Sequence, residues 1–224
     1  GTKMMWIPEK FAFRAGMITT SAWDDWDDAN IGTGSFASGE DTKASGQYSI
    51  AMGINTTATN YASTALGSGS DATGEYSTAI GQNAKASGKW STAIGRSSDA
   101  TGDYSTAMGH GIKASGEYSF AIALANQAFT NITQANTMAI IGGKVGIGDR
   151  TPEQALSVSG NLEVDNGDTS GGAVLFHEDS DNGSHSVAFQ AASSIDSDVT
   201  WTLPGADGTD GHVLSTNGSG ILSW

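Results

Sequence analysis

The chain of 224 residues has no cysteine, which excludes disulfide bonds and thiolate metal sites. It has no run of 18 apolar residues, so we expect no membrane insertion in this segment. The sequence motifs of common hydrolases, zinc proteases and nucleotide-binding loops are also missing. We therefore expect a protein that is not an enzyme, with no catalytic residues, no metal site and no cofactor.

Positive charge is missing from the last third of the chain. Residues 151–224 carry 11 Asp and Glu but no Lys or Arg, whereas residues 1–150 carry 13 acidic and 10 basic residues. The net charge is −14 at pH 7. Binding to phosphate needs cations, so we expect no nucleic-acid partner. We expect the acidity to favour solubility and to oppose clumping; binding of a divalent cation is the alternative.

What the chain has in abundance is glycine, with 31 residues, and a repeat of 14 residues that runs from Gly34 to about Ala128. Each copy carries a motif such as 76–81, Tyr-Ser-Thr-Ala-Ile-Gly, and a second half-motif of the form Ala-Ser-Gly or Ala-Thr-Gly. A fixed period indicates stacked structural units. The repeat therefore predicts a rod rather than an enzyme pocket.

The pattern inside each copy is that of short β-strands. Tyr76, Thr78 and Ile80 share one parity, and Ser77 and Ala79 take the other, which is the alternation of a strand. The recurring glycines fit tight turns. We expect an all-β solenoid of about seven coils, each with two short strands.

Each coil holds only one or two large apolar side chains, such as Tyr76 with Ile80. At about 25 cal/mol per Å² of buried apolar surface, so few groups poorly offset about 1–2 kcal/mol of backbone entropy per residue. The Ser and Ala face is small enough for another backbone to approach closely, so we expect an obligate oligomer. We expect Ile80, Ile94 and Met108, which share one phase of the repeat, to form a buried structural core along the rod.

Charged residues provide a prediction of register. Asp71, Lys85, Asp99 and Lys113 are 14 residues apart and alternate in sign. Opposite charges on adjacent strands stabilise a sheet by roughly 0.2–1 kcal/mol per pair. We therefore expect an inter-coil charge ladder in which each coil lies directly on the next in parallel register.

These repeats also resemble a known family. The motifs at 76–81 and 90–95, with Ala-Ser-Gly between them, resemble the head repeats of trimeric autotransporter adhesins over about residues 34–128. The resemblance implies a homotrimer of left-handed parallel β-rolls. Residues 142–162 and 200–218 are similar to modules of phage tail fibres and related bacterial surface fibres.

The remaining segments are assigned from composition. We expect an N-terminal aromatic cap at 1–33, the β-roll at 34–130, a neck at 131–150 and an acidic, β-rich C-terminal module at 151–224. Residues 23–28 of the cap read Trp-Asp-Asp-Trp-Asp-Asp, and a ligand-binding patch there is an alternative to capping. Expected C-terminal strands are 155–158, 161–165, 173–177, 185–190, 199–203 and 212–215, with Asn-Gly and Asp-Gly turns between them.

Two short segments of the acidic module carry side chains of the types that bind metal ions. His177 and His185 lie near Glu178, Asp179 and Asp181, a set that could hold a metal. The segment 179–183 opens like a calcium loop but lacks the closing Glu. We interpret both as solvated turns.

The function expected from the sequence is that of a non-enzymatic trimeric fibre, extracellular, on a virion or a bacterial cell. The expected partners are its own copies and a cell-surface glycan or protein. A phage tail fibre is the first hypothesis; the alternatives are a bacterial trimeric autotransporter adhesin passenger and a polysaccharide depolymerase. Outward aromatics such as Trp90 and Tyr104 could contact sugars, although packing explains them about equally well.

Overall fold

The computed structural model describes residues 1–19, 25–164, 171–178, 181, 183–192, 194–219 and 221–224. The chain divides into two compact units, Gly1–Ser159 and Gly160–Trp224. The described residues are almost entirely strands and turns, with two short 3-10 helices, η1 (Pro8–Lys10) and η2 (Asp28–Asn30). None of the described helices is long and apolar enough for a membrane span.

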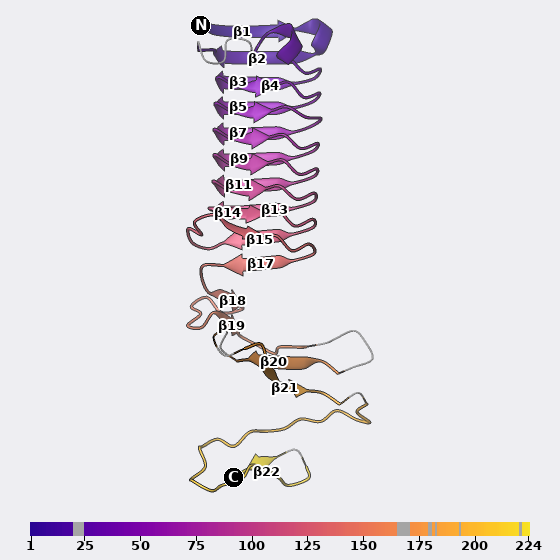
Figure 1. The fold of residues 1–224 in the computed structure, drawn as a ribbon, viewed down its shortest axis with the longest axis vertical. Helices are drawn as coiled ribbons and strands as arrows, with labels where there is room; N and C mark the ends of the chain where they lie inside the picture. The colour runs from indigo at the N-terminus through magenta and orange to yellow at the C-terminus, as the bar shows by residue number, and fades with distance from the viewer. Residues whose placement is uncertain (20–24, 165–170, 179–180, 182, 193, 220) are drawn as a thin grey trace. The chain divides into compact units, whose positions relative to one another are not determined.

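The first unit is a solenoid whose coils stack along one axis (Figure 1). One side is a ten-stranded sheet. Its strands, in spatial order, are β1 (Thr2–Ile7), β2 (Ala12–Met17), β3 (Phe36–Glu40), β5 (Ile50–Ile54), β7 (Thr64–Ser68), β9 (Thr78–Gln82), β11 (Thr92–Arg96), β13 (Thr106–His110), β15 (Phe120–Ala123) and β17 (Met138–Ile141).

The other side is a seven-stranded sheet of shorter strands. Each of seven coils contributes one strand to each sheet, so the expected all-β solenoid of about seven parallel coils is confirmed. The strands of this sheet, in spatial order, are β16 (Thr130–Ile132), β14 (Ile112–Ala114), β12 (Asp99–Ala100), β10 (Lys85–Ala86), β8 (Asp71–Ala72), β6 (Thr57–Ala58) and β4 (Lys43–Ala44).

The interior of each coil is built from alanine and serine. Ala79 and Ala93 of the ten-stranded sheet and Ala86 of the facing sheet are 0% exposed. Ser77 and Ser91 are buried beside them. A coil of 14 residues brings its two sheets close together, so small side chains fill most of the interior; Ile112, 1% exposed, is the largest fully buried apolar side chain among the described residues.

The expected buried core of Ile80, Ile94 and Met108 therefore needs correction. These residues do form one column in parallel register, but on the outer face of the ten-stranded sheet, where each is half-buried in the single chain. They share a parity opposite to that of the interior alanines. At these three positions the large side chain therefore lies on the outer face, and the neighbouring alanines of the same strands face the interior.

Serine hydroxyls close the turns that begin each coil. Ser77 Oγ donates a hydrogen bond to the carbonyl oxygen of Gly74 at 2.7 Å, and Ser91 repeats the contact with Gly88 at 2.6 Å. The glycine at the fourth position of the long strands from β3 to β13 is required by space. A Cβ at Gly81, where φ is +135°, would lie 2.0 Å from the carbonyl oxygen of Gly95.

The N-terminal end of the solenoid is closed by a hairpin and one buried cation. Strand β2 pairs antiparallel with β1 and parallel with β3, so it belongs to the long sheet. Arg14 on β2 lies in register with the interior residue Ala37 and is 0% exposed. Its guanidinium donates to the carbonyl oxygens of Phe13, Ser35 and Ala44 at 2.8, 3.1 and 2.8 Å. It also donates to Ser35 Oγ at 2.7 Å.

Both sheets continue past residue 130, into the segment expected to be a neck. Strands β16 and β17 pair in parallel with β14 and β15, with Phe120 opposite Met138. This last coil is longer than 14 residues, which explains why the period disappears from the sequence. A separate parallel pair follows, β18 (Val145–Ile147) and β19 (Leu156–Val158).

The second unit has little regular structure. It contains the hairpin of β20 (Ala173–His177) and β21 (Ser186–Gln190) and the pair β22 (Ser215–Thr216) and β23 (Leu222–Ser223). Residues 161–164 form no strand, and residue 165 lies outside the described residues. In place of an expected strand at 199–203, Thr202 makes one isolated bridge to Ile221.

Candidate binding surfaces

The outer face of the ten-stranded sheet carries two columns of mainly apolar side chains, which we call the apolar face. Their register follows from the strand pairing, and the chain itself covers neither column. The first column contains Trp6, Phe13, Phe36, Ile50, Thr64, Thr78, Thr92, Thr106, Phe120 and Met138. The second contains Met4, Ala15, Ser38, Met52, Leu66, Ile80, Ile94, Met108, Ile122 and Ile140.

This face is unusual for a parallel sheet. Parallel sheets occur almost only where both faces are covered, and a contiguous exposed apolar patch marks an interaction site. Here the inner face is covered by the second sheet, and Ile50, Met52, Met138 and Ile140 on the outer face remain exposed. The apolar face is therefore the main candidate for contact with another protein surface.

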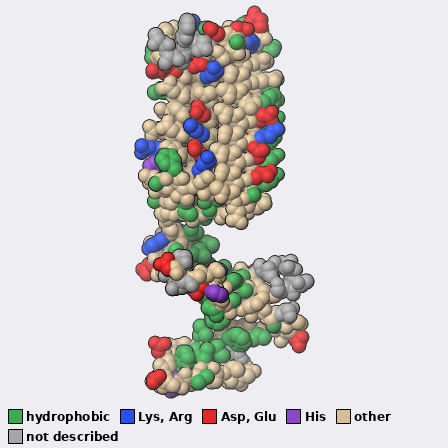
Figure 2. Space-filling view, viewed as in Figure 1, with side chains coloured by type: hydrophobic (Ala, Val, Ile, Leu, Met, Phe, Trp, Pro, Cys, Tyr) green, Lys and Arg blue, Asp and Glu red, His purple; other side chains and the backbone are tan. Residues whose placement is uncertain are grey.

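The charge column Asp71, Lys85, Asp99, Lys113 lies on successive strands of the seven-stranded sheet. Lys85 is directly opposite Asp71 on one side and Asp99 on the other, and Asp99 is opposite Lys113. Figure 2 shows blue and red side chains alternating on a face of the solenoid that is otherwise mainly tan. The ion pairs found among the described residues, however, include none between members of this column.

Electrostatics within the ladder is a balance of two effects. Partial burial raises the pKa of Asp99, and the positive charges of Lys85 and Lys113 act in the opposite direction. Burial is the larger effect. The lysines thus reduce the penalty of placing a carboxylate against the sheet, which is a weaker role than that of closed salt bridges.

A column of aromatic side chains runs along the turns at one edge of the solenoid. Tyr76 and Trp90 stack with ring centroids 3.9 Å apart at an interplanar angle of 6°. Tyr104 and Tyr118 stack at 4.8 Å, and Tyr61 contacts the rings of Tyr48 and Tyr76 edge-on. The side chains remain between 37% and 54% exposed although the rings contact one another. Each carries a phenol hydroxyl or an indole N–H, so the column combines apolar ring surface with hydrogen-bonding groups.

The sequence pattern identified this column only in part. Tyr61 lies one residue out of phase, because Ala62 occupies the position that Tyr76 and Trp90 hold in their coils. The residues in this phase adopt a left-handed backbone, with φ of 50° at Ala62 and 57° at Tyr76. Only the fold shows that the Tyr61 ring contacts the rings of Tyr48 and Tyr76 and so belongs to the column.

Charges flank the aromatic column. Lys89 Nζ lies 2.6 Å from Glu75 Oε2, and the hydrogen bond and attraction of that carboxylate raise the pKa of Lys89. The backbone N–H of Lys89 donates to Asp103 Oδ1 at 2.8 Å. Because these groups are exposed to solvent, their ion pair contributes little to stability, and their charges remain available to a partner.

The minor sites have local structural explanations. His185 Nδ1 lies 2.9 Å from Glu178 Oε1, and hydrogen bonds from His185 lower the pKa of Glu178. The described residues contain no group of three or more metal-ligating side chains, and Asp179, Ser180 and Asn182 lie outside them.

The aromatic cap segment is also partly structural. Trp26 is buried and donates from Nε1 to the carbonyl oxygen of Thr42 at 2.9 Å. Asp25 pairs with Lys43 at 3.2 Å. The preceding residues of the proposed patch, Trp23 and Asp24, lie outside the described residues.

Comparison with known proteins connects the solenoid to one family model. Residues 44–70, 72–98, 91–111 and 100–122 match the YadA head domain repeat. A comparison with curated proteins gave no match. The matched residues coincide with the regular coils from β4 to β15, so this part of the chain is similar to the repeat of an adhesin head, a β-roll of surface fibres.

Proposed function

We propose that the chain is a segment of a non-enzymatic, homotrimeric fibre that projects from a virion or a bacterial cell and binds a cell surface. The apolar face carries this proposal. It extends along the whole long sheet, from Met4 and Trp6 on β1 to Met138 and Ile140 on β17, and these four side chains are exposed in the described solenoid. Association with other copies would remove this long apolar surface from water.

Three copies explain the face better than an unrelated partner. Identical chains have identical coil spacing, so each column of one chain matches a column of the next along its whole length. When three chains are related by a closed threefold rotation, the apolar face of every chain is buried, and none is left to bind a further copy. The similarity of residues 44–122 to YadA head repeats supports the same arrangement, because heads of that type are homotrimers.

Sedimentation of the purified chain at low micromolar concentration tests the assembly. We expect a single species of three times the chain mass, with β-rich circular dichroism. A folded, soluble monomer with the same spectrum would contradict the proposal.

For binding, we propose the aromatic column and its flanking charges as the surface that contacts a cell-surface glycan or protein. The column faces solvent, and its hydroxyl and indole donors suit a partner rich in hydroxyl and carbonyl oxygens. The test compares Trp90→Ala and Tyr104→Ala with Lys85→Ala, a change at an exposed position on the seven-stranded sheet. We expect the first two variants to lose binding to host cells or to an immobilised glycan panel while remaining trimeric, and the control to bind normally.

We infer the attachment point from the neighbouring segments. The family match covers only coils of the adhesin-head type, and a virion origin rests on the resemblance to tail-fibre modules expected from the sequence at 142–162 and 200–218. We propose a virion tail fibre as the parent structure, and a bacterial surface adhesin as the second candidate, favoured by the repeat match. Immunogold labelling of particles and of producing cells with an antibody to the chain distinguishes them: label on virion tails supports the first, and label only on cells supports the second.

A further inference from the structure

The hairpin of the C-terminal unit has one face made only of apolar side chains. Val174 lies opposite Phe189, and Phe176 lies opposite Val187. The two phenylalanine rings meet edge-on at 6.1 Å, which places all four side chains on the same face. We call these four residues the hairpin face. They are between 41% and 78% exposed, so the rest of the unit leaves them in water.

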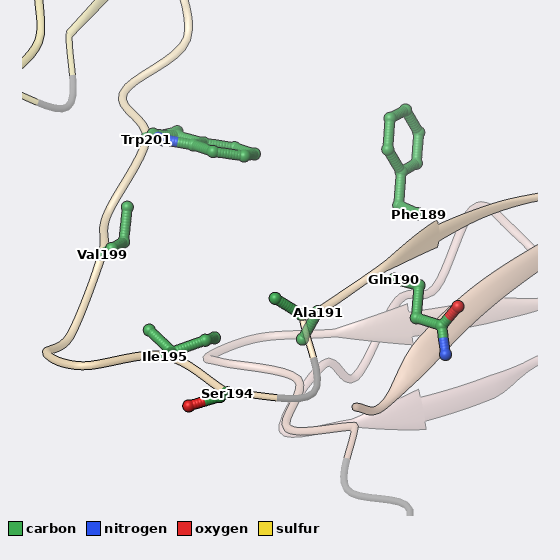
Figure 3. Close-up of a pocket in the computed structure, with 8 residues that line it drawn as sticks. Phe189, Gln190, Ala191, Ser194, Ile195, Val199 and Trp201 are labelled. Atoms are coloured by element: carbon green, nitrogen blue, oxygen red, sulfur yellow. The ribbon is translucent and has the colours of Figure 1, made fainter. Parts of the chain in front are cut away.

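An open cavity of about 560 Å³ lies beside this face. Phe189 and Trp201 stand on opposite sides of it, with Ile195 and Val199 along one edge, as Figure 3 shows. None of the described residues that line the cavity is charged. The segment that carries Ile195, Val199 and Trp201 therefore leaves the hairpin face open instead of covering it.

A two-stranded hairpin with an exposed apolar face is marginally stable in water and needs further strands or another covering surface. The chain of the described second unit supplies no such cover, because all of the fully buried apolar residues occur before residue 122. The occupant must therefore come from outside this unit.

We propose that the hairpin face and the cavity beside it pack against the same unit of the other copies in the trimer, so that three C-terminal units share one apolar core. This inference rests on the homotrimer of the proposed function. Trimeric solenoids would hold three such units on short tethers, at a local concentration in the millimolar range or above.

Charge and composition favour a copy of the chain over another partner. Residues 151–224 contain 11 acidic residues and no Lys or Arg, so anionic membranes, nucleic acids and acidic glycans are repelled. The four residues of the hairpin face and the described residues that line the cavity are uncharged. Identical units can therefore meet there without bringing their carboxylates together. Each unit offers both an apolar projection, Val187 and Phe176, and an apolar cavity to receive it.

Single cysteines provide the test, because the chain has none of its own. Val187 is on the hairpin face, and its neighbour Ala188 is on the opposite face; both are exposed in the single chain. We compare full-length Val187→Cys and Ala188→Cys in sedimentation, in reaction with a charged maleimide and in cross-linking with a short bismaleimide.

The expected result is that both variants are trimers, that the Val187→Cys thiol reacts at least tenfold more slowly than the Ala188→Cys thiol, and that it forms interchain cross-links. Equal reaction rates in a trimeric protein would overturn the shared core and leave the trimer intact. Slow reaction without any interchain product would show that the same chain covers the face, which also overturns it. A monomeric protein would refute the proposed trimer and, with it, this inference.

A second variant tests the consequence for folding. Phe189→Asp places a carboxylate in the shared core, while the solenoid is untouched. We expect hydrogen exchange of residues 173–190 to speed up at least tenfold, with the exchange of residues 78–109 and the trimer unchanged. Unchanged exchange at 173–190 would contradict the shared core.

Discussion

At the scale of single residues, the width of the coil decides which side chain goes where. The long strand of each coil offers two parities, and apolar character alone assigns Ile80 and Ile94 to the interior. The structure reverses this, with Ala79 and Ala93 inside at 0% exposure. Size therefore outweighs hydrophobicity on the long strands, where the inward-facing residue is an alanine although Ile112 is accommodated inside on the seven-stranded sheet.

This reversal gives a direct prediction for two neighbouring positions. Ala93→Ile adds three carbons to a filled interior, so we expect it to lower stability by about 1–3 kcal/mol or to prevent folding. Thr92→Ile introduces the same residue one position earlier, on the outer face, where the equivalent position of β5 already carries Ile50. We expect that control to melt at or above the parent temperature. Equal losses in a thermal scan would mean that the two faces are assigned wrongly.

Arg14 is the residue on which the N-terminal end depends. Burial without a carboxylate partner lowers its pKa to about 10, which leaves the guanidinium charged at neutral pH. At this end no further coil of described residues packs on the solenoid, and the Arg14 guanidinium donates hydrogen bonds to Ser35 and Ala44 there.

We therefore expect Arg14→Ala to lower the free energy of unfolding by about 2–4 kcal/mol, through a cavity and lost hydrogen bonds. Arg14→Met fills the volume and removes a buried charge, so its loss should be smaller, since apolar replacement of buried ions is often neutral. Urea unfolding monitored by circular dichroism, at one protein concentration for all variants, measures both. A methionine variant less stable than the alanine variant would contradict this account of the end.

At the scale of elements, the strands stack in a register that the charge column makes testable. Lys85→Asp would place three carboxylates on adjacent strands about 4.8 Å apart. We expect a loss of about 1 kcal/mol or more per chain at low salt, and less at high salt because exposed charges are screened. The readout is the melting temperature at two ionic strengths.

The control for the ladder is Thr57→Asp, which adds a negative charge in the same column but opposite Lys43 as well as Asp71. Attraction and repulsion should partly cancel there, although Lys43 also pairs with Asp25. If both variants shifted the melting temperature equally and independently of salt, electrostatic contact between coils would not be the cause.

The period of the sequence made the coils, their parallel register and the positions of the turns predictable, because each depends on spacing alone. The pattern at residues 71–113 is enough to place Lys85 between two aspartates. The pattern does not show how wide the coil is, so it predicts the wrong face of the strand for the side chain of Ile94. The pattern also does not predict the last coil, because extra residues between Ile122 and Ile140 interrupt the 14-residue spacing although strands β15 and β17 still pair.

The C-terminal unit was harder to predict for a different reason. The strands at 173–177 and 186–190 have clear apolar alternation and form as expected or nearly so. Segments such as 161–164 and 199–201 have strand-like composition but no pairing partner within the chain. Local preference cannot supply a partner, and if partners come from other copies, a single sequence does not reveal them.

At the scale of the whole molecule, we expect the apolar face to determine whether the chain is a monomer or a trimer. Ile94→Asp places a charge in the middle of the second column, where association would bury it without a partner. We expect assembly to fail, with monomers or aggregates in sedimentation in place of the trimer. Gln82→Asp, on the same sheet but at an exposed position outside the two columns, should assemble normally. Normal assembly and melting of the Ile94 variant would show that the trimer forms through another surface.

The charge ladder limits how such a rod can change its length. The backbone repeats every 14 residues, but the sign of the ladder repeats every 28, since Asp71 matches Asp99 and Lys85 matches Lys113. Removing one coil, residues 78–91, would join the backbone smoothly and yet place two aspartates side by side. Removing two coils restores the alternation. As a molecular ruler, this solenoid should be shortened or extended most readily in double steps of roughly 9.6 Å, twice the spacing between strands.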